Sequence, residues 1–228
     1  MKSGKYKNQI NLLIEQCHEL NSNFNFNFGV DNNHKNGRLE SYNLENIYLQ
    51  NLKKKLEKND FIMEISKERH WYDMKINDIP MNLKLSSFGG ADNAFNKKSI
   101  LYSIRGDISN INYGNMNNKE FFEELKKKDL WKNERNIETE YHFLVINKLK
   151  PSEIIIKSLF DIKKYISNPT NILQVEWKKE LKNIDYTCDN IDEKISQLLK
   201  TIQLSYRKKT CDMENYVNCD IDDLVYKK

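Results

Sequence analysis

The chain has 228 residues and a formal net charge of +4 at pH 7, from 37 Lys and Arg against 33 Asp and Glu. This length predicts a single domain over residues 1–228 with a sizeable core, and it argues against a second large domain. No apolar run is long enough for a membrane span, and residues 1–13 lack the apolar segment of a secretory signal. The modest positive charge permits a polyanionic partner but does not require one.

The cysteines are sparse and unpaired in their spacing. Cys17, Cys188, Cys211 and Cys219 form no CxxC pattern and are too few for a disulfide framework in a chain of this length. We therefore expect free thiols and a soluble, cytoplasmic protein. A structural zinc site made from the last three cysteines is the alternative, although their spacings match no common zinc-finger pattern.

Apolar periodicity predicts helices and strands along most of the chain. Helical spacing predicts helices over residues 5–20, 39–58, 94–105, 119–131 and 191–209. Alternating or β-branched segments predict strands over residues 61–66, 71–76, 81–86, 141–146, 153–160 and 172–177. Between them we expect an extended, polar segment at 21–38, a helical turn at 162–166 and an acidic tail from 211. This order predicts an α/β fold with one mixed β-sheet flanked by helices.

Residues 71–87 predict a β-hairpin with one apolar face and one polar face. Apolar and polar side chains alternate through residues 71–76 and again through 81–86, on either side of a turn predicted at 77–80. Because side chains alternate with a period of two, Asp73, Asn82 and Lys84 share one face. Alignment of the two apolar rows places Asp73 directly opposite Lys84, with Asn82 diagonal to Asp73.

This polar face has the residue types of a hydrolytic metal site. Mg²⁺ prefers hard oxygen ligands and keeps several waters, so one or two carboxylates with a substrate phosphate can hold it. Asp73 can anchor such a metal, Asn82 offers a side-chain carbonyl, and Lys84 can stabilise charge on a phosphoryl oxygen. Glu45 lies at helical spacing from Leu49 and Leu52, so we expect it to point toward the sheet and to supply the second anion.

The order of these residues resembles the PD-(D/E)xK nuclease fold, and in particular type II restriction endonucleases. Tyr72-Asp73 corresponds to the Pro-Asp of that motif and Asn82-Leu83-Lys84 to its (D/E)xK. Tyr replaces Pro, and Asn replaces the usual acid, which removes one negative charge from the metal site.

The resemblance implies a magnesium-dependent deoxyribonuclease that cleaves double-stranded DNA at a short palindromic, A·T-rich site as a homodimer. It implies a catalytic core over about residues 39–177 and a helical region over 185–228. The implied catalytic residues are Asp73, Asn82, Lys84 and Glu45, and the implied metal site is formed by Asp73, Glu45, Asn82 and Leu83.

The segment after the hairpin is the expected DNA-contacting loop. It contains a Gly pair followed by Asn and Lys residues, types that contact adenine edges and phosphates. We expect DNA contacts from Ser86, Ser87, Gly89, Gly90, Asp92, Asn93, Asn96, Lys97 and Lys98. The simpler interpretation is a polar loop in which Asp92 or Asn93 caps the next helix.

Other interpretations remain open from the sequence. Asp73 and Lys84 can form a cross-strand ion pair on a solvated face, with no catalytic role. The motif can also be placed with Asp60 as the anchor and Asp73-Met74-Lys75 as the DxK, and Glu40 rivals Glu45 as the helix acid. At the level of function, the alternatives are a repair or recombination nuclease of the same fold and a non-catalytic DNA-binding module.

Overall fold

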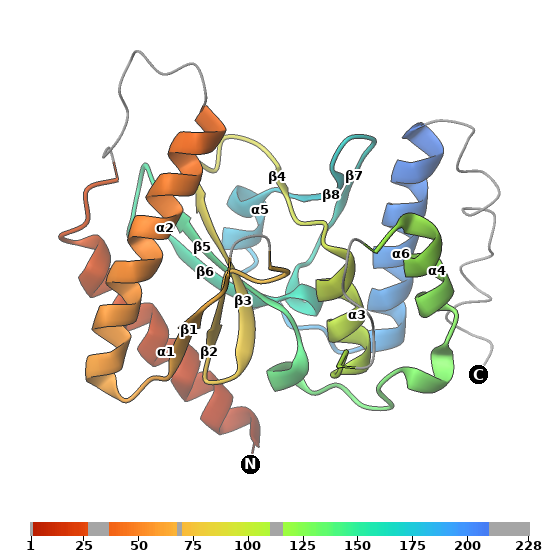
Figure 1. The fold of residues 1–228 in the computed structure, drawn as a ribbon, viewed down its shortest axis with the longest axis horizontal. Helices are drawn as coiled ribbons and strands as arrows, with labels where there is room; N and C mark the ends of the chain where they lie inside the picture. Colours follow the sequence, from red (N-terminus) through yellow and green to blue (C-terminus); the bar gives the residue numbers. More distant parts are fainter. Residues whose placement is uncertain (1, 27–36, 68–69, 110–115, 210–228) are drawn as a thin grey trace. The chain divides into compact units, whose positions relative to one another are not determined.

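The structure is a computed structural model that describes residues 2–26, 37–67, 70–109 and 116–209 (Figure 1). The chain divides into two compact units, one formed by Met1–Gly89 with His142–Ile156 and the other by Gly90–Tyr141 with Lys157–Lys228. We refer to them as unit 1 and unit 2. The α/β class with a mixed sheet flanked by helices is confirmed, whereas the single domain stays a prediction.

Unit 1 is built on a five-stranded mixed sheet with strand order β1-β2-β3-β5-β6. The strands β1, β2 and β3 are antiparallel neighbours, and β5 lies parallel to β3. The segments predicted as strands at 141–146 and 153–160 form the neighbouring strands β5 and β6. The elements are α1 (Lys2–Asn21), α2 (Gly37–Leu56), the 3-10 turn η1 (Glu57–Asn59), β1 (Met63–Ile65), β2 (Met74–Ile76), β3 (Ile79–Ser86), β5 (His142–Asn147) and β6 (Ile154–Ser158), of which the last two residues belong to unit 2.

The helices α1 and α2 pack against the apolar side chains of this sheet. Leu13 and Cys17 of α1, and Tyr48 and Leu52 of α2, are almost fully buried in one cluster with Met81 of β3. The spacing of these residues along each helix puts them on one stripe, which is the reason each helix buries a single face. Polar side chains that alternate with the buried ones along β3 are thereby directed away from this core.

Unit 2 contains a separate three-stranded sheet with strand order β4-β8-β7, in which both pairings are antiparallel. The described residues of this unit also form α-helices and 3-10 turns. The elements are β4 (Asp92–Asn93), α3 (Lys97–Arg105), α4 (Asn118–Leu125), the 3-10 turns η2 (Lys128–Leu130), η3 (Ile137–Thr139) and η4 (Leu159–Asp161), β7 (Ile166–Asn168), β8 (Ile172–Val175), α5 (Trp177–Leu181) and α6 (Ile191–Lys209).

Several local predictions are corrected by these elements. The strands form two sheets and not one. Asp92 and Asn93 lie in a strand, β4, because they pair with β8, and the cap of α3 is Asn96, whose side chain accepts hydrogen bonds from the backbone of Lys98 and Ser99. The helical turn expected at 162–166 is also wrong, since Ile166 begins the strand β7.

The hairpin turn is shorter than the sequence predicts. Met74 pairs with Met81 and Ile76 with Ile79, so only Asn77 and Asp78 form the turn. Both turn residues have positive φ, 48° and 69°, a conformation that Asn and Asp tolerate and that two-residue hairpins favour because it matches the twist of the strands. The pairing of the two hairpin strands is therefore shifted by two residues from the predicted alignment. The prediction that Asp73 lies directly opposite Lys84 is wrong.

Among the described helices, none combines the length and the apolar character that a membrane crossing requires. The predicted tail from residue 211, Cys211 and Cys219 lie outside the described residues, and so does most of the predicted extended segment at 21–38.

Candidate active site

Asp73 lies in a bend immediately before β2, and its carboxylate turns back onto β3. Its Oδ2 accepts a hydrogen bond of 2.8 Å from the backbone N–H of Leu83 and one of 2.5 Å from Nδ2 of Asn82. Burial raises the pKa of Asp73, and the hydrogen bond from Leu83 and the charge of Lys84 oppose this shift. Asp73 is thus a largely buried carboxylate whose ionised form is stabilised by a nearby positive charge.

Glu45 reaches the same stretch of β3 from the helix α2. Its Oε1 accepts a hydrogen bond of 3.4 Å from the backbone N–H of Leu85. The helix places it there because Glu45 lies four and seven residues before Leu49 and Leu52, which are buried against the sheet. The prediction that Glu45 points toward the sheet is confirmed.

The two carboxylates bind alternate backbone N–H groups along one edge of β3. The ladder between β2 and β3 ends at Met74, so β3 continues beyond its partner strand. Alternate N–H groups of a strand point to the same side, and those of Leu83 and Leu85 are taken by Asp73 and Glu45 in place of a neighbouring strand. The main-chain geometry of β3 therefore holds both acids on either side of Lys84.

Lys84 and Asn82 project from β3 in alternation with buried residues. Met81 and Leu83 belong to the core, whereas Asn82 and Lys84 are half-buried on the opposite face. Lys84 is diagonal to Asp73, near enough for its charge to lower the pKa of that carboxyl. The predicted grouping of these polar residues on one face survives the change of register, because a shift of two residues preserves the face of every side chain.

Asn82 carries an unusual buried atom. Its Nδ2 donates to Asp73, but its Oδ1 has no hydrogen-bond partner in the described part of the chain. A buried carbonyl oxygen without a donor is unfavourable, and a cation satisfies it. The donors fit Mg²⁺, because Asp73, Glu45 and Asn82 supply hard oxygen atoms.

The described residues contain no group of three or more His, Cys, Asp or Glu with the geometry of a metal site. A cation at this position would therefore depend on two carboxylates and the Asn82 amide. This is the effect of Asn in place of the acid that the motif normally has.

The predicted DNA-contacting residues fall into both units. Ser86, Ser87 and Gly89 belong to unit 1, where Ser86 is buried and its Oγ accepts a hydrogen bond from the backbone of Phe88. The remaining members lie in unit 2. Among them, Gly90 is exposed, Asp92 and Asn93 form β4, Asn96 caps α3, and Lys97 and Lys98 occupy its first turn.

The alternative placement of the motif fits the structure less well. Asp60 has a positive φ of 60°, ends the turn η1 and is exposed, which is the arrangement of a turn residue. Lys75 pairs with Glu64 across β1 and β2, and its ammonium lies 5.4 Å from the centre of the Tyr72 ring. The side chain of Glu40 lies outside the described part of the structure.

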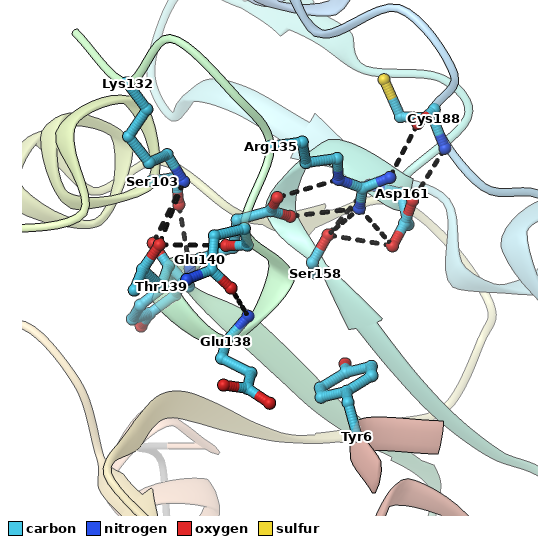
Figure 2. Close-up of polar contacts among 12 residues, drawn as sticks. Tyr6, Ser103, Lys132, Arg135, Glu138, Thr139, Glu140, Ser158, Asp161 and Cys188 are labelled. Carbon is cyan, nitrogen blue, oxygen red and sulfur yellow. Dashed lines mark hydrogen bonds and ion pairs between the residues drawn. The ribbon is translucent and has the colours of Figure 1, made fainter. Parts of the chain in front are cut away.

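Unit 2 contains a polar cluster that the sequence analysis did not single out. The Arg135 guanidinium donates hydrogen bonds to Glu140, Ser158, Asp161 and the Cys188 carbonyl at distances of 2.7 to 3.2 Å (Figure 2). Each of its nitrogens has an acceptor, so the cluster is complete in itself and stabilises the fold of unit 2. No sequence signal connects these residues, because they are separated by up to 53 positions.

Comparisons with known proteins add no relative: no family model, no curated protein and no solved structure matches the chain. The function must be argued from the site alone.

Proposed function

We propose that the protein is a magnesium-dependent endonuclease that hydrolyses phosphodiester bonds of double-stranded DNA. The observation that carries this proposal is the pair of carboxylates, Asp73 and Glu45, held by alternate N–H groups of β3 on either side of Lys84. The buried, unpartnered Oδ1 of Asn82 beside Asp73 adds a third oxygen. Acidic oxygens next to a fixed cation are the groups that metal-assisted phosphodiester hydrolysis needs.

Each side chain has a distinct part in this proposal. Asp73 and Glu45 would hold the metal through their carboxylates, and Asn82 would add its amide oxygen. The metal, when bound, supplies a hydroxide near neutral pH and polarises the phosphoryl oxygen. Lys84 stabilises negative charge on the phosphoryl group and orients the attacking water.

The finer assignment is a type II, site-specific enzyme of the PD-(D/E)xK class. It rests on the resemblance of Tyr72-Asp73 and Asn82-Leu83-Lys84 to the motif, and on Glu45 reaching the motif strand. Cleavage at a short palindromic, A·T-rich site would require a homodimer, since two-fold symmetric sites are matched by two-fold symmetric proteins.

A direct test is incubation of the purified protein with a supercoiled plasmid of mixed sequence and Mg²⁺. We expect discrete fragments that disappear with chelator and in the variant Asp73→Ala, while Asp60→Ala, which removes the exposed turn carboxylate, cleaves normally. A smear without discrete bands would favour a repair or recombination nuclease. Cleavage that persists in Asp73→Ala would refute the assignment of the site.

The second candidate is a DNA-binding module without catalytic activity, and Asn82 is the observation that favours it. An amide in place of an acid lowers the negative charge that holds a metal. This candidate predicts DNA binding without metal-dependent cleavage under any divalent cation, and the same plasmid assay separates the two.

A further inference from the structure

The ends of three helices meet in unit 2. Phe95, two residues before the start of α3, packs edge-on against Phe121 of α4 and Tyr206 of α6, with ring centres 6.1 and 6.4 Å away. The Tyr206 hydroxyl also hydrogen-bonds to Oδ1 of Asn118 at the start of α4, over 2.6 Å. This aromatic contact brings the N-termini of α3 and α4 beside the C-terminus of α6.

Basic residues occupy two of these helix ends, and we call them together the basic surface: Lys97 and Lys98 in the first turn of α3, with Arg207, Lys208 and Lys209 in the last turn of α6. The last three are exposed and the first two half-buried. Lys97 and Lys209 lie close enough for the charge of Lys209 to contribute to a lowered pKa of Lys97, whose main cause is burial; the charge of Glu120 opposes the shift.

Two members of the basic surface are held in place by neutral oxygens. The Lys97 ammonium donates to the Met116 carbonyl over 2.8 Å, and the Lys208 ammonium donates to Oγ of Ser167 over 2.7 Å. These acceptors are neutral, so the bonds restrict the side chains without cancelling their charge, and Glu120 offsets part of the charge of Lys97. A cation held in position by neutral oxygens is suited to an external anion.

Helix stability explains only part of this arrangement. Cations at the C-terminus of α6 interact favourably with its dipole. Lys97 and Lys98 stand at the N-terminus of α3, where the dipole is already positive and a cation is unfavourable. The local energetics of α3 therefore give no reason for these lysines, whereas a bound polyanion does.

We propose that the basic surface binds the phosphate backbone of double-stranded DNA. The choice of DNA rests on the proposed function, but the binding surface does not depend on catalysis. The proposal extends the predicted contacts of Lys97 and Lys98 to Arg207, Lys208 and Lys209, which the sequence separates from them by more than a hundred positions.

The test measures DNA binding in the presence of chelator, so that cleavage plays no part. A fluorescein-labelled duplex is titrated with the full chain over a series of salt concentrations, and fluorescence anisotropy gives the dissociation constant. The variant is Lys97→Gln/Lys208→Gln/Lys209→Gln. The matched control is Lys54→Gln/Lys58→Gln/Lys178→Gln, which changes the net charge equally at exposed lysines on other elements.

We expect the variant to bind about tenfold more weakly at moderate salt, with the slope of log K against log salt reduced by about 2 to 3, since each phosphate contact contributes about 0.9. The control variant should retain most of the DNA affinity and most of the salt slope of the parent protein. Equal losses in the two proteins would assign the effect to net charge and overturn the proposal, as would unchanged binding in the variant.

Loss of the Lys97 bond to Met116 can itself disturb unit 2, so Lys208→Gln/Lys209→Gln is measured as well. These exposed side chains end a helix, and thermal unfolding should match the parent protein. A slope reduced by about 1 to 2 supports the proposal, and an unchanged slope contradicts it. Failure of the plasmid assay with intact DNA binding would refute catalysis and leave the basic surface standing.

Discussion

Asn82 donates a hydrogen bond of 2.5 Å from its Nδ2 to Oδ2 of Asp73, and the opposite side of the same amide leaves Oδ1 buried without a partner. One side of the amide therefore satisfies Asp73, and the other side needs a donor or a cation. A carboxylate at this position would repel Asp73, so under the proposed function an amide favours the stability of the site and weakens its hold on a metal.

The Asn82→Asp substitution tests this balance. Without metal, we expect a lower melting temperature at neutral pH, because two buried carboxylates would lie in contact. With Mg²⁺, the new carboxylate should tighten metal binding, so the rise in melting temperature on adding Mg²⁺ should exceed that of the parent protein. Differential scanning fluorimetry with and without chelator measures both effects. An equal Mg²⁺ response in the two proteins would exclude Asn82 from the metal site.

Lys84 and Lys75 separate the two placements of the motif. We expect Lys84→Ala to reduce the cleavage rate by about a hundredfold or more, since a fixed donor to the reacting group is lost, with little change in DNA affinity. Lys75→Ala, on the neighbouring strand, should cleave within a few-fold of the parent. Single-turnover cleavage and anisotropy measure the two quantities, and the reverse result would favour Asp60 as the metal anchor.

Glu45 should matter for its charge and not for its hydrogen bond. Glu45→Gln retains an oxygen that can accept from the Leu85 N–H, so the fold should persist with an unchanged circular dichroism spectrum. The loss of one negative charge should raise the Mg²⁺ concentration needed for half-maximal cleavage by about tenfold or more. Glu57→Gln, at an exposed position in the turn η1, is the control. An unchanged Mg²⁺ requirement would remove Glu45 from the site.

The raised pKa of Asp73 predicts a pH-dependent stability in the metal-free protein. Because the folded protein holds this proton more tightly than the unfolded chain, stability falls as pH rises from the ordinary Asp value of about 3.9 through the raised value. Urea unfolding in the presence of chelator, measured at a series of pH values across this interval, should show the fall in the free energy of unfolding. The Asp73→Asn variant should show a smaller fall. Mg²⁺ affinity should change in the opposite sense and rise with pH, because the metal binds the ionised form. A decline of equal size in Asp73→Asn would assign the effect to other groups.

Arg135 should be a main determinant of the stability of unit 2. Its ion-pair partners Glu140 and Asp161 are buried, with side chains 0% and 8% exposed, so Arg135→Met removes the guanidinium that pairs with both carboxylates. We expect a loss of about 3 to 5 kcal/mol in the free energy of unfolding. Lys179→Met, which removes the exposed ion pair with Glu176, should cost less than about 1 kcal/mol. Denaturant unfolding of both variants measures the difference, and similar losses would contradict a structural role for the Arg135 cluster.

The sequence by itself determined the helices α1, α2 and α6, the paired strands β5 and β6, and the face on which Asn82 and Lys84 lie. These features depend on side-chain periods of 3.6 and 2, which are properties of a short segment. The orientation of Glu45 toward the sheet could also be predicted, because its spacing from Leu49 and Leu52 puts it on the packed stripe of α2, whereas its contact with β3 came from the fold.

Only the tertiary structure decided the register of the hairpin and the partners of Asp73. The register depends on the backbone dihedrals of Asn77 and Asp78, and two-residue and four-residue turns are both compatible with the same alternation of side chains. The Arg135 cluster and the basic surface join segments far apart in the chain, so they follow from packing that no local pattern encodes. For Asn82, the face of the strand on which it lies could be predicted from the sequence. Its unpartnered oxygen beside Asp73 could be found only in the tertiary structure.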